Sequence, residues 1–350
     1  MQDSHVIADK TLQVSHSWDG VYRLHGNGVY KDRHWVWAIF PELFPLPPNA
    51  KKTSSVTTFA CACGKTVLLE EAYVPEDAGT PGHYGCPSCG YVVPYHSSFQ
   101  PQEGISSRGK IVALQQPSET ALWLADLGAG VGNLCYPLLE KSKNFRVLAS
   151  DYSAQSLSIL RRRDRYDPTL IRTLVHDVTR PFPTHVVVQE DGWCVEAPDK
   201  RGECLLGRFA YATYFFVLSA LFDISAISNA ITNALTLLSD TGVLLIHDYA
   251  TGDYREEKFS RRGPPDGVLE LPQAEGNLFL ARRYTRMGEE TTAAFFNPEG
   301  LTSLCASIGT VIECTVRDHQ RENRKIGARW AQRYVTVKLR HRKGDVPKGK

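Results

Sequence analysis

The chain has 350 residues, of which 42% are hydrophobic, and its formal net charge is +2. This length and composition allow one large core with a small accessory unit. They argue against a membrane-spanning helix, because the longest apolar run, residues 209–222, is interrupted by Thr213 and Ser219 and falls short of the roughly 20 residues that cross a bilayer.

Nine cysteines accompany an N-terminus that carries Asp3 and Asp9 but no hydrophobic signal core. Without a secretory signal, cysteines point to a reducing compartment and to metal binding or packing rather than to disulfides. We therefore expect a cytoplasmic or nuclear protein with no membrane partner, or a mitochondrial protein if a presequence has been removed.

Residues 1–48 are expected to form an aromatic N-terminal arm. The arm ends in the proline-rich stretch FPELFPLPPN, which cannot continue a helix and marks a boundary. Residues 49–110 then change composition to paired cysteines, glycine, proline and serine, with little helical periodicity. We interpret this second segment as an insertion ahead of the main domain.

Two cysteine pairs in the insertion have the spacing of a zinc site. They are Cys61-x-Cys63 and Cys86-x-x-Cys89, and each pair is followed by glycine. Such pairs let the backbone curl around a tetrahedral metal, and four cysteines make a closed, structural site. The insertion is therefore predicted to bind zinc and to grip RNA or a partner. His83 and His96 are substitute ligands, and isolated buried thiols are the alternative.

Strand-like and helix-like segments alternate through residues 121–177. This alternation predicts a parallel sheet covered on both faces. Residues 111–343 are assigned to this α/β domain, with a hairpin insertion at about 181–208 and a basic tail at 344–350. Residues 329–342 alternate as a late, antiparallel edge strand.

A glycine-rich loop follows the first expected strand and opens a helix. It reads Asp126-Leu127-Gly128-Ala129-Gly130-Val131-Gly132-Asn133. Glycines let the chain turn sharply and approach a ligand where a Cβ would clash. A dinucleotide site prefers G-x-G-x-x-G, whereas this loop is G-x-G-x-G with an acidic residue two positions earlier. The spacing favours S-adenosylmethionine over a pyrophosphate-bearing cofactor, and a purely structural turn is the alternative.

Carboxylates close the next two expected strands. Asp151 lies 23 residues after Gly128, where it can accept hydrogen bonds from both ribose hydroxyls. Asp177 closes the third strand, at a place suited to the adenine amino group. Either aspartate alone could be a helix N-cap. The loop and both carboxylates together predict a class I methyltransferase fold, which is Rossmann-like with a mostly parallel, seven-stranded sheet.

Basic charge is concentrated near the C-terminus, where residues 317–350 carry twelve Lys and Arg against three Asp and Glu. A second cluster, formed by Arg161, Arg162, Arg163 and Arg165, ends an expected helix. A solvated surface is the ordinary role of such clusters. Taken together they suggest a polyanionic partner, because phosphate backbones are bound through Lys and Arg.

Several blocks outside the insertion occur in a fixed order. They are Trp18-Asp19 with Tyr22, YKDRHW (30–35), Pro41-Glu42-Leu43, GAGVGN (128–133) with YPLL (136–139), SDYS (150–153), HDVT (176–179), FVLSA (216–220), HDY (247–249), NRK (323–325) and the strand that contains Trp330. These blocks resemble those of the eukaryotic tRNA 3-methylcytidine methyltransferases. KDRHW and FVLSA are more diagnostic of the family than the glycine loop.

The resemblance implies N3-methylation of a cytidine in a tRNA anticodon loop, with S-adenosylmethionine as methyl donor. A tRNA would be the partner, or a ribosomal RNA, with a further protein that presents the RNA. The implied cofactor-binding residues are Trp18, Tyr22, Asp126, Gly128, Gly130, Asp151, Asp177, Val178 and Phe215. Trp18 and Tyr22 would close over the cofactor, or they could form an i, i+4 aromatic pair that packs the arm onto the core.

Transfer to cytosine N3 needs little general-base help, because this nitrogen offers a lone pair at neutral pH. Catalysis therefore depends on aligning N3, the methyl carbon and the sulfur. The base must leave any pairing and stack on aromatic side chains. The aromatic candidates are Trp35, Trp37, Tyr249 and Phe296, each of which could instead be core. Asp248 and Tyr249 are the candidate catalytic residues, with the Asp248 carboxylate expected to stabilise the cationic product ring.

Three positions depart from the family pattern on the substrate side. Ala210 replaces an aspartate, His247 replaces an arginine, and Glu257-Lys258-Phe259 replaces L-R-F. An alternative function is therefore a degenerate methyltransferase fold that serves as a structural or assembly factor in an RNA–protein complex. Methylation of a protein or a small molecule is a third, because a fold alone does not determine the substrate.

Overall fold

The computed structural model describes residues 18–43 except 29, 121–261 except 143, 200 and 222, 281–286, 291–323 and 327–342, with short strands at 58–60, 66–68, 83–85, 92–94 and 268–270. The predicted zinc ligands Cys61, Cys63, Cys86 and Cys89 lie outside these residues. None of the described helices is long and apolar enough to cross a membrane.

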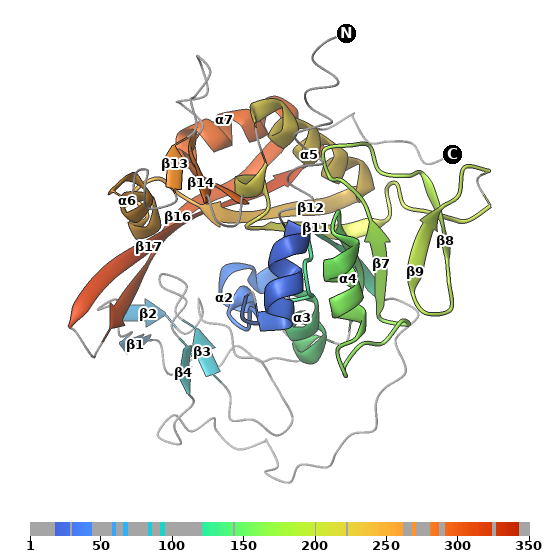
Figure 1. Cartoon of the computed structure of the whole chain (residues 1–350), viewed down its shortest axis with the longest axis horizontal. Coiled ribbons are helices and arrows are strands. Elements are labelled where there is room, and N and C mark those ends of the chain that lie inside the picture. The colour runs from blue at the N-terminus through green and yellow to red at the C-terminus, as the bar shows by residue number, and fades with distance from the viewer. Residues whose placement is uncertain are drawn as a thin grey trace.

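A ten-stranded sheet forms the centre of the molecule (Figure 1). Its order is β10-β8-β9-β7-β6-β5-β11-β12-β17-β16. The bounds in chain order are β5 Leu122–Leu127, β6 Phe145–Asp151, β7 Ile171–Val175, β8 His185–Val188, β9 Trp193–Glu196, β10 Glu203–Cys204, β11 Phe209–Phe215, β12 Leu238–Tyr249, β16 Thr310–Asn323 and β17 Ala328–Arg340. Neighbours from β7 to β12 are parallel, and β17 is antiparallel to both β12 and β16. The strands from β7 to β16 confirm the predicted mostly parallel α/β sheet.

β17 is not the edge strand that its alternation predicted. β16 pairs with it in antiparallel register from Thr310↔Arg340 to Asn323↔Ala328, so β17 lies between β12 and β16. The prediction was wrong because β16 is mainly polar from Arg317 to Asn323. Its hydrogen bonds to β17, rather than an apolar pattern of its own, hold it in the sheet.

Three further strands extend the sheet beyond β7. β8 and β9 form an antiparallel hairpin, and β9 runs parallel to β7 only at Thr173↔Trp193 and Leu174↔Cys194. Gly192 immediately precedes β9 and has φ 82°, a left-handed conformation that favours glycine. These strands lie within the segment 181–208 that the sequence indicated as an insertion.

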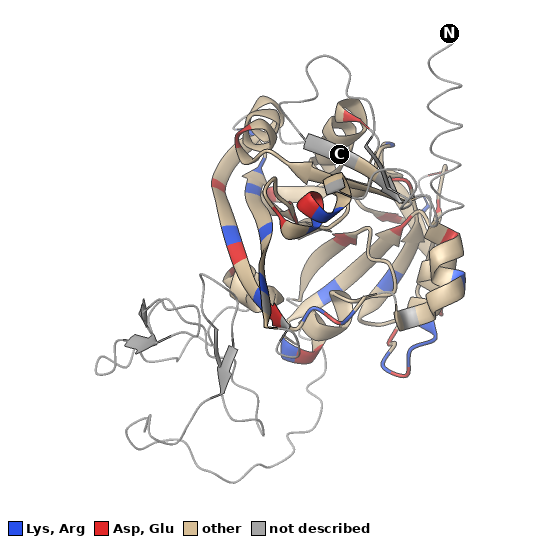
Figure 2. Ribbon diagram, turned by 60° about the vertical axis from the view of Figure 1, so that its left-hand side comes forward, with Lys and Arg blue, Asp and Glu red and all other residues tan. Residues whose placement is uncertain are grey.

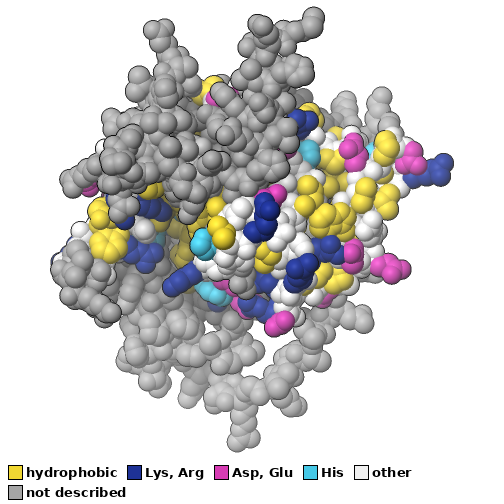
Figure 3. Space-filling view, in the orientation of Figure 1, with side chains coloured by type: hydrophobic (Ala, Val, Ile, Leu, Met, Phe, Trp, Pro, Cys, Tyr) yellow, Lys and Arg dark blue, Asp and Glu magenta, His cyan; other side chains and the backbone are white. Residues whose placement is uncertain are grey.

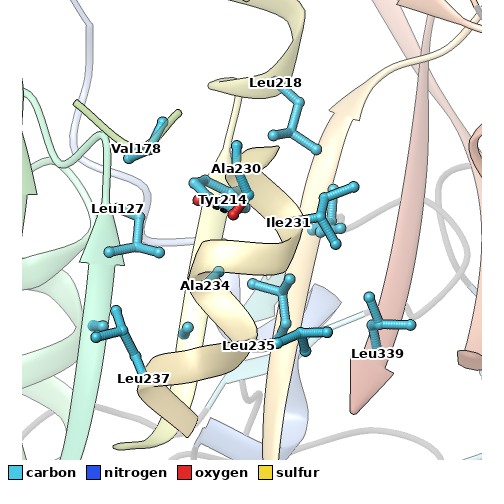
Figure 4. Packing of buried hydrophobic residues seen from close by; sticks show 14 of the residues in the cluster. Leu127, Val178, Tyr214, Leu218, Ala230, Ile231, Ala234, Leu235, Leu237 and Leu339 are labelled. Atoms are coloured by element: carbon cyan, nitrogen blue, oxygen red, sulfur yellow. Dashed lines mark hydrogen bonds between the residues drawn. The ribbon is translucent and has the colours of Figure 1, made fainter. Parts of the chain in front are cut away.

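Helices cover both faces of the sheet. α3 (Cys135–Lys141) and α4 (Ala154–Arg161) pack on one face, and α5 (Ile224–Leu237) and α7 (Pro298–Ile308) pack on the other. α5 begins at Asp223, whose side chain accepts a hydrogen bond from the backbone N–H of Ala226 and so caps the helix. Figure 4 shows α5 burying Ala230 and Ile231 against the sheet.

Smaller elements complete the edge near β12. They are η3 (Leu218–Ala220), α6 (Tyr254–Arg261) and a three-stranded sheet of β13 (Val268–Glu270), β14 (Ala281–Arg286) and β15 (Thr291–Phe296). A bridge between Ala250 and Phe296 joins β15 to the end of β12. Two separate hairpins pair β1 (Thr58–Ala60) with β2 (Thr66–Leu68) and β3 (His83–Gly85) with β4 (Val92–Pro94).

The arm is part of the core. Residues 18–25 are helical, and η1 (Gly26–Gly28), α2 (Val36–Ile39) and η2 (Pro41–Leu43) follow. Trp37 is 3% exposed and packs with α3 and β6, and Phe296 is completely buried. Both were candidates for stacking on a target base, and that expectation is wrong because neither ring is accessible to a ligand.

Ion pairs tie the arm to the end of α4. The guanidinium of Arg163 donates to both carboxylate oxygens of Asp32 at 3.0 and 2.7 Å. Arg165 pairs with Asp32 and Glu140, and Arg161 pairs with Asp191. In Figure 3, basic side chains beside α4 are accordingly interspersed with acidic ones. Arg161, Arg163 and Arg165 therefore stabilise the protein through ion pairs, and the expectation that this cluster contributes to binding a polyanion stays a prediction.

Replacing Asp32 with asparagine is expected to lower the free energy of unfolding by about 1–3 kcal/mol. The reason is that Arg163 and Asp32 are only 15% and 17% exposed, so the change leaves a largely buried guanidinium without its charge partner. Urea denaturation measures the effect. Asp199→Asn is the control, because the Arg201–Asp199 pair is 87% and 57% exposed. Equal losses in the two variants would contradict this prediction.

Candidate functional site

The glycine loop lies at the carboxyl end of β5 and adopts a conformation that needs glycine. Gly128, Gly130 and Gly132 have φ angles of 75°, 56° and 84°, which side chains on L-residues rarely adopt. A Cβ on Gly128 would overlap the Val217 side chain, and one on Gly130 would lie 2.7 Å from the Tyr22 hydroxyl. The loop is therefore shaped by close neighbours on two sides, the turn after β11 and the arm.

Asp151 at the end of β6 holds this loop in place. Its Oδ2 accepts the backbone N–H of Gly130 at 2.8 Å, and its Oδ1 accepts that of Ser153 at 2.9 Å. The carbonyl of Ser150 accepts the N–H groups of Gly128 and Ala129. Burial raises the pKa of Asp151 to about 6, although the backbone hydrogen bonds oppose the rise. Asp151, the residue predicted to bind the ribose, thus lies directly beside the glycine loop.

Asp177 and Val178 follow β7 at the same edge of the sheet. The N–H of His176 donates to the carbonyl of Asp151 at 3.0 Å, which brings the two strand ends together. Asp177 Oδ1 accepts from the N–H and the hydroxyl of Thr179. Val178 is buried, and its carbonyl accepts from the Asn233 side chain. Both residues therefore lie at the same edge of the sheet as Asp151 and the glycine loop.

Asp126 lies beneath the loop. It is 2% exposed, and its carboxylate accepts from the Cys135 thiol at 3.2 Å and from the Thr213 hydroxyl at 2.9 Å. Burial raises its pKa, and the charge of Arg33 and these two hydrogen bonds oppose the rise. These contacts give Asp126 a role in linking β5 to α3 and β11.

The arm covers the loop. Tyr22 is 7% exposed, and its ring centroid lies 5.9 Å from that of Trp18. The hydroxyl of Ser153 donates to the Asp19 carboxylate at 2.5 Å. Burial raises the pKa of Tyr22, and the nearby Asp151 carboxylate adds to the rise. The two predicted roles of Trp18 and Tyr22 therefore meet here, since the packed aromatic pair lies over the residues predicted to bind the cofactor.

Phe216, the first residue after β11, has the one positive φ angle among described residues other than glycine, at 58°. Such a conformation costs on the order of 1–3 kcal/mol and is often found at functional sites. The Phe216 N–H donates to the His247 carbonyl at 2.9 Å. Its ring lies 4.7 Å from that of Tyr249 and 5.6 Å from that of Tyr334. Phe216 and Tyr249 are both partly exposed and form an aromatic surface beside the glycine loop.

Phe215 points instead into the packing between arm and sheet. It is 2% exposed, with ring contacts to Phe40 and Trp35. His247 belongs to the same aromatic group and donates to, or accepts from, the Thr336 hydroxyl at 2.8 Å. Burial lowers its pKa well below the usual value, and nearby cationic side chains lower it further. His247 is therefore neutral at physiological pH, so this position carries no buried cation.

Asp248 is completely buried under the turn that carries Phe216. Its Oδ2 accepts the backbone N–H of Ser219 at 3.0 Å, and its Oδ1 accepts that of Tyr249 at 2.8 Å. Burial raises its pKa to about 6, and the hydrogen bonds from Ser219 oppose the rise. These contacts place Asp248 where it supports the turn, with Tyr249 on the accessible side.

The sequence did not single out Arg33 or Phe216 as site residues. The Arg33 guanidinium lies over the rings of Phe215 and Phe216, at 5.4 and 5.3 Å from their centroids. Its backbone N–H donates to the carbonyl of Asn133 in the glycine loop at 2.8 Å. The arginine within KDRHW could have indicated this position, but the left-handed backbone of Phe216 has no signature in its residue type.

The residues present fit a nucleoside cofactor. Three left-handed glycines leave the loop without side chains, and a buried carboxylate lies beside them. Asn133 Oδ1 and Ser150 Oγ are buried at the same edge without a hydrogen-bond partner among the described residues. Buried polar atoms are normally paired, so these two atoms leave hydrogen-bonding capacity unused beside the glycine loop.

Comparison with known proteins identifies relatives at low identity. The chain is 26% identical over 310 residues to the tRNA N(3)-cytidine methyltransferase METTL2 of Mus musculus. This match covers 86% of the chain and 68% of that protein. It is 27% identical over 190 residues to the tRNA N(3)-methylcytidine methyltransferase trm141 of Schizosaccharomyces pombe, covering 54% of this chain and 68% of that protein. No family model matches the chain.

Among solved structures, a similar one is a SAM-dependent methyltransferase from Methanosarcina mazei, with 14% identity and a TM-score of 0.43, covering 64% of this chain and 94% of that one. The strand order of the chain itself shows the fold class, and the similarity to the curated proteins extends over most of the chain. Over most of its length, this chain is a divergent relative of the tRNA N(3)-cytidine methyltransferases.

Proposed function

We propose that this protein is an S-adenosylmethionine-dependent methyltransferase that acts on N3 of a cytidine in a tRNA anticodon loop. The observation that carries the proposal is the junction of three strand ends. Gly128, after β5, packs against Val217 in the turn that follows β11. The backbone N–H of Gly130 donates a hydrogen bond to Asp151 at the end of β6. A cofactor on the glycine loop would therefore lie directly beside the Phe216–Tyr249 surface.

S-adenosylmethionine would supply an electrophilic methyl group at this junction. Gly128 and Gly130 would admit the cofactor to the backbone, Asp151 would accept from its ribose, and Asp177 and Val178 would border its adenine. On the acceptor side, Phe216 and Tyr249 would stack a splayed base, which aligns N3 without a general base. Asp248 would act by holding the turn through Ser219.

The β16–β17 hairpin supports RNA as the substrate. β12 accompanies β17 only as far as Tyr249↔Tyr334, so the hairpin extends beyond the sheet. Its outer face carries cross-strand ion pairs, Asp318 with Arg333 and Glu322 with Arg329. Figure 2 shows basic residues along this hairpin together with a few acidic ones.

The face of the hairpin toward the arm is different. Here Arg317 lies opposite Tyr334, and Arg321 lies opposite Trp330, whose ring stacks on Tyr254 with centroids 5.6 Å apart. Burial and the adjacent arginines lower the pKa of His319 to about 4, so this histidine adds no positive charge at neutral pH. Alternating guanidinium and aromatic groups suit single-stranded RNA.

The decisive experiment is mass spectrometry of nucleosides from cells that lack the protein. We expect 3-methylcytidine to fall in at least one tRNA, and purified protein to restore it with S-adenosylmethionine. Unchanged 3-methylcytidine in every tRNA and ribosomal RNA fraction would overturn the proposal and favour the structural or assembly factor. A need for a second protein to present the tRNA would appear as activity in extract but not with purified protein.

Cofactor affinity is expected to fall as the pH drops through about 6, because the ribose hydroxyls donate to an ionised Asp151 whose pKa is about 6. The loss of cofactor affinity approaches tenfold per pH unit below that value.

The free energy of unfolding changes with pH in the opposite sense. The pKa of Asp151 is higher in the folded protein than in the unfolded chain. The contribution of Asp151 to the free energy of unfolding is therefore greatest below the unfolded pKa of about 4 and is lost as the pH rises through about 6.

Calorimetric titration between about pH 5 and pH 7.5 measures this dependence. Asp248 titrates in the same range, and Asp151→Asn separates the two groups because that variant should bind weakly at every pH without the Asp151 transition. A wild-type affinity that stays constant from pH 5 to pH 7 would contradict the assignment of Asp151.

We further propose that the protein acts in the cytoplasm, nucleus or mitochondrion.

We also propose that Cys61, Cys63, Cys86 and Cys89 hold a zinc ion. The cysteine spacing supports this site. Elemental mass spectrometry is expected to find one zinc per chain, and a Cys86→Ser/Cys89→Ser variant to lose it. Cys204→Ser is the matched control, since Cys204 is an exposed free thiol. Wild-type protein without zinc would refute the site.

A further inference from the structure

A half-buried cation at the centre of the site, Arg33, has no anionic partner among the residues that the structure describes. The Arg33 guanidinium makes neither a hydrogen bond nor an ion pair with the described part of the chain, and its contacts are the rings of Phe215 and Phe216. Other arginines of the arm interface and the acceptor side are paired, as with Arg163 to Asp32 and Arg255 to Asp253. A partly desolvated charge without a counter-charge is unfavourable, so Arg33 is suited to an external anion.

Two buried carboxylates, Asp126 and Asp248, feel the charge of Arg33 without pairing with it. Asp126 is occupied by Cys135 and Thr213, and Asp248 is occupied by backbone N–H groups. Both carboxylates are also buried below the loop and the turn. Neither carboxylate forms a hydrogen bond or an ion pair with the guanidinium, which lies over the rings of Phe215 and Phe216.

A backbone hydrogen bond of Arg33 to the glycine loop determines where an anion on its side chain would lie. The N–H of Arg33 donates to the carbonyl of Asn133 at 2.8 Å, which attaches this part of the arm to the end of the glycine loop. The side chain therefore starts from a backbone bonded to the loop and ends over the Phe216 ring. S-adenosylmethionine carries a sulfonium cation, which an uncompensated guanidinium would repel, and an α-carboxylate, which a guanidinium binds through paired N–H groups.

We infer that Arg33 binds the α-carboxylate of S-adenosylmethionine. The inference rests on the proposed function, because it takes that cofactor as the ligand of the glycine loop. Arg33 belongs to the arm, so cofactor binding would also stabilise the docked arm. The neutralised guanidinium would then no longer oppose the positive charge that develops on the methylated base.

The test compares S-adenosylmethionine with its decarboxylated analogue by calorimetric titration. Wild-type protein is expected to prefer S-adenosylmethionine. Arg33→Gln should weaken binding of S-adenosylmethionine roughly 10- to 100-fold, in keeping with a lost charge-assisted pair, while affinity for the analogue stays the same or improves. Arg33→Lys should keep part of the preference. Arg23→Gln is the matched control, because Arg23 is an exposed arm residue whose hydrogen bond within the described part of the chain goes to the Asp19 carbonyl.

Three outcomes would overturn the inference. Equal weakening of both ligands by Arg33→Gln would show that the side chain only positions the arm. An unchanged preference in Arg33→Gln and Arg33→Lys, with loss of RNA affinity, would assign the guanidinium to a phosphate of the substrate. Wild-type protein that binds neither ligand would instead defeat the proposed function itself, which separates the two failures. Thermal melting of each variant confirms that it is folded.

Discussion

Gly128→Ala is expected to weaken S-adenosylmethionine binding by about 100-fold or more, which corresponds to about 2.7 kcal/mol. Gly128 has φ 75°, and a Cβ there would overlap the Val217 side chain. The left-handed backbone alone costs roughly 1–2 kcal/mol for an L-residue. The overlap adds to this cost and pushes the loop away from the turn that carries Phe216. Calorimetric titration measures the affinity, and urea denaturation measures the stability.

Gly207→Ala is the matched control for this variant. Gly207 has φ 67°, yet no atom lies within 4 Å of the Cβ that alanine would add. It precedes β11, at the opposite end of that strand from the site. This variant should lose a similar amount of backbone stability while keeping its cofactor affinity. Loss of affinity in both variants, in proportion to stability, would show that the loop geometry has no specific role.

Phe216→Ala is expected to lower kcat/KM for RNA methylation roughly 10- to 100-fold, since stacking of a base on an aromatic ring contributes about 1–3 kcal/mol. Phe216 lies beside Tyr249 and is partly exposed, whereas the cofactor loop contacts Val217. Affinity for S-adenosylmethionine should therefore fall less than the rate of methylation, because Phe216 reaches the cofactor side only through its contact with Arg33. Single-turnover methylation of tRNA and calorimetric titration provide the two measurements.

Phe216→Tyr controls for the loss of the ring. It keeps the aromatic face and the left-handed backbone, so most of the activity should remain. If Phe216→Ala instead weakens cofactor binding as much as it slows methylation, the ring belongs to the cofactor side. A variant with full activity would mean that the target base stacks elsewhere, with Trp35 and Tyr249 as the remaining candidates.

The cofactor half of the site was predictable because it is local in sequence. Gly128, Gly130 and Asp151 lie within one strand–loop–helix–strand segment, and parallel strands bring their carboxyl ends to one edge. The acceptor half is assembled from segments far apart in the chain. Arg33 reaches Phe216 from the arm, and Tyr334 reaches it from β17. No spacing in the sequence encodes these contacts.

Several errors have the same origin. Trp37 and Phe296 were aromatic candidates for the substrate side, but a residue type does not state which face of an element is covered. The sequence also did not indicate that Arg163 is paired with Asp32 of the arm. β16 was missed because its polar residues are held by β17 rather than by burial.

The sequence by itself determined the α/β fold class, the glycine loop with its two strand-end carboxylates, and the resemblance that led to the family. These depend on short-range backbone rules, in which glycine permits left-handed turns and alternating strands and helices form a parallel sheet. Only the tertiary structure decided that Asp248 lies buried beneath the turn and that Phe216 adopts φ 58° beside Arg33. Burial and strain of this kind arise from packing between distant segments, so they appear only when the chain is folded.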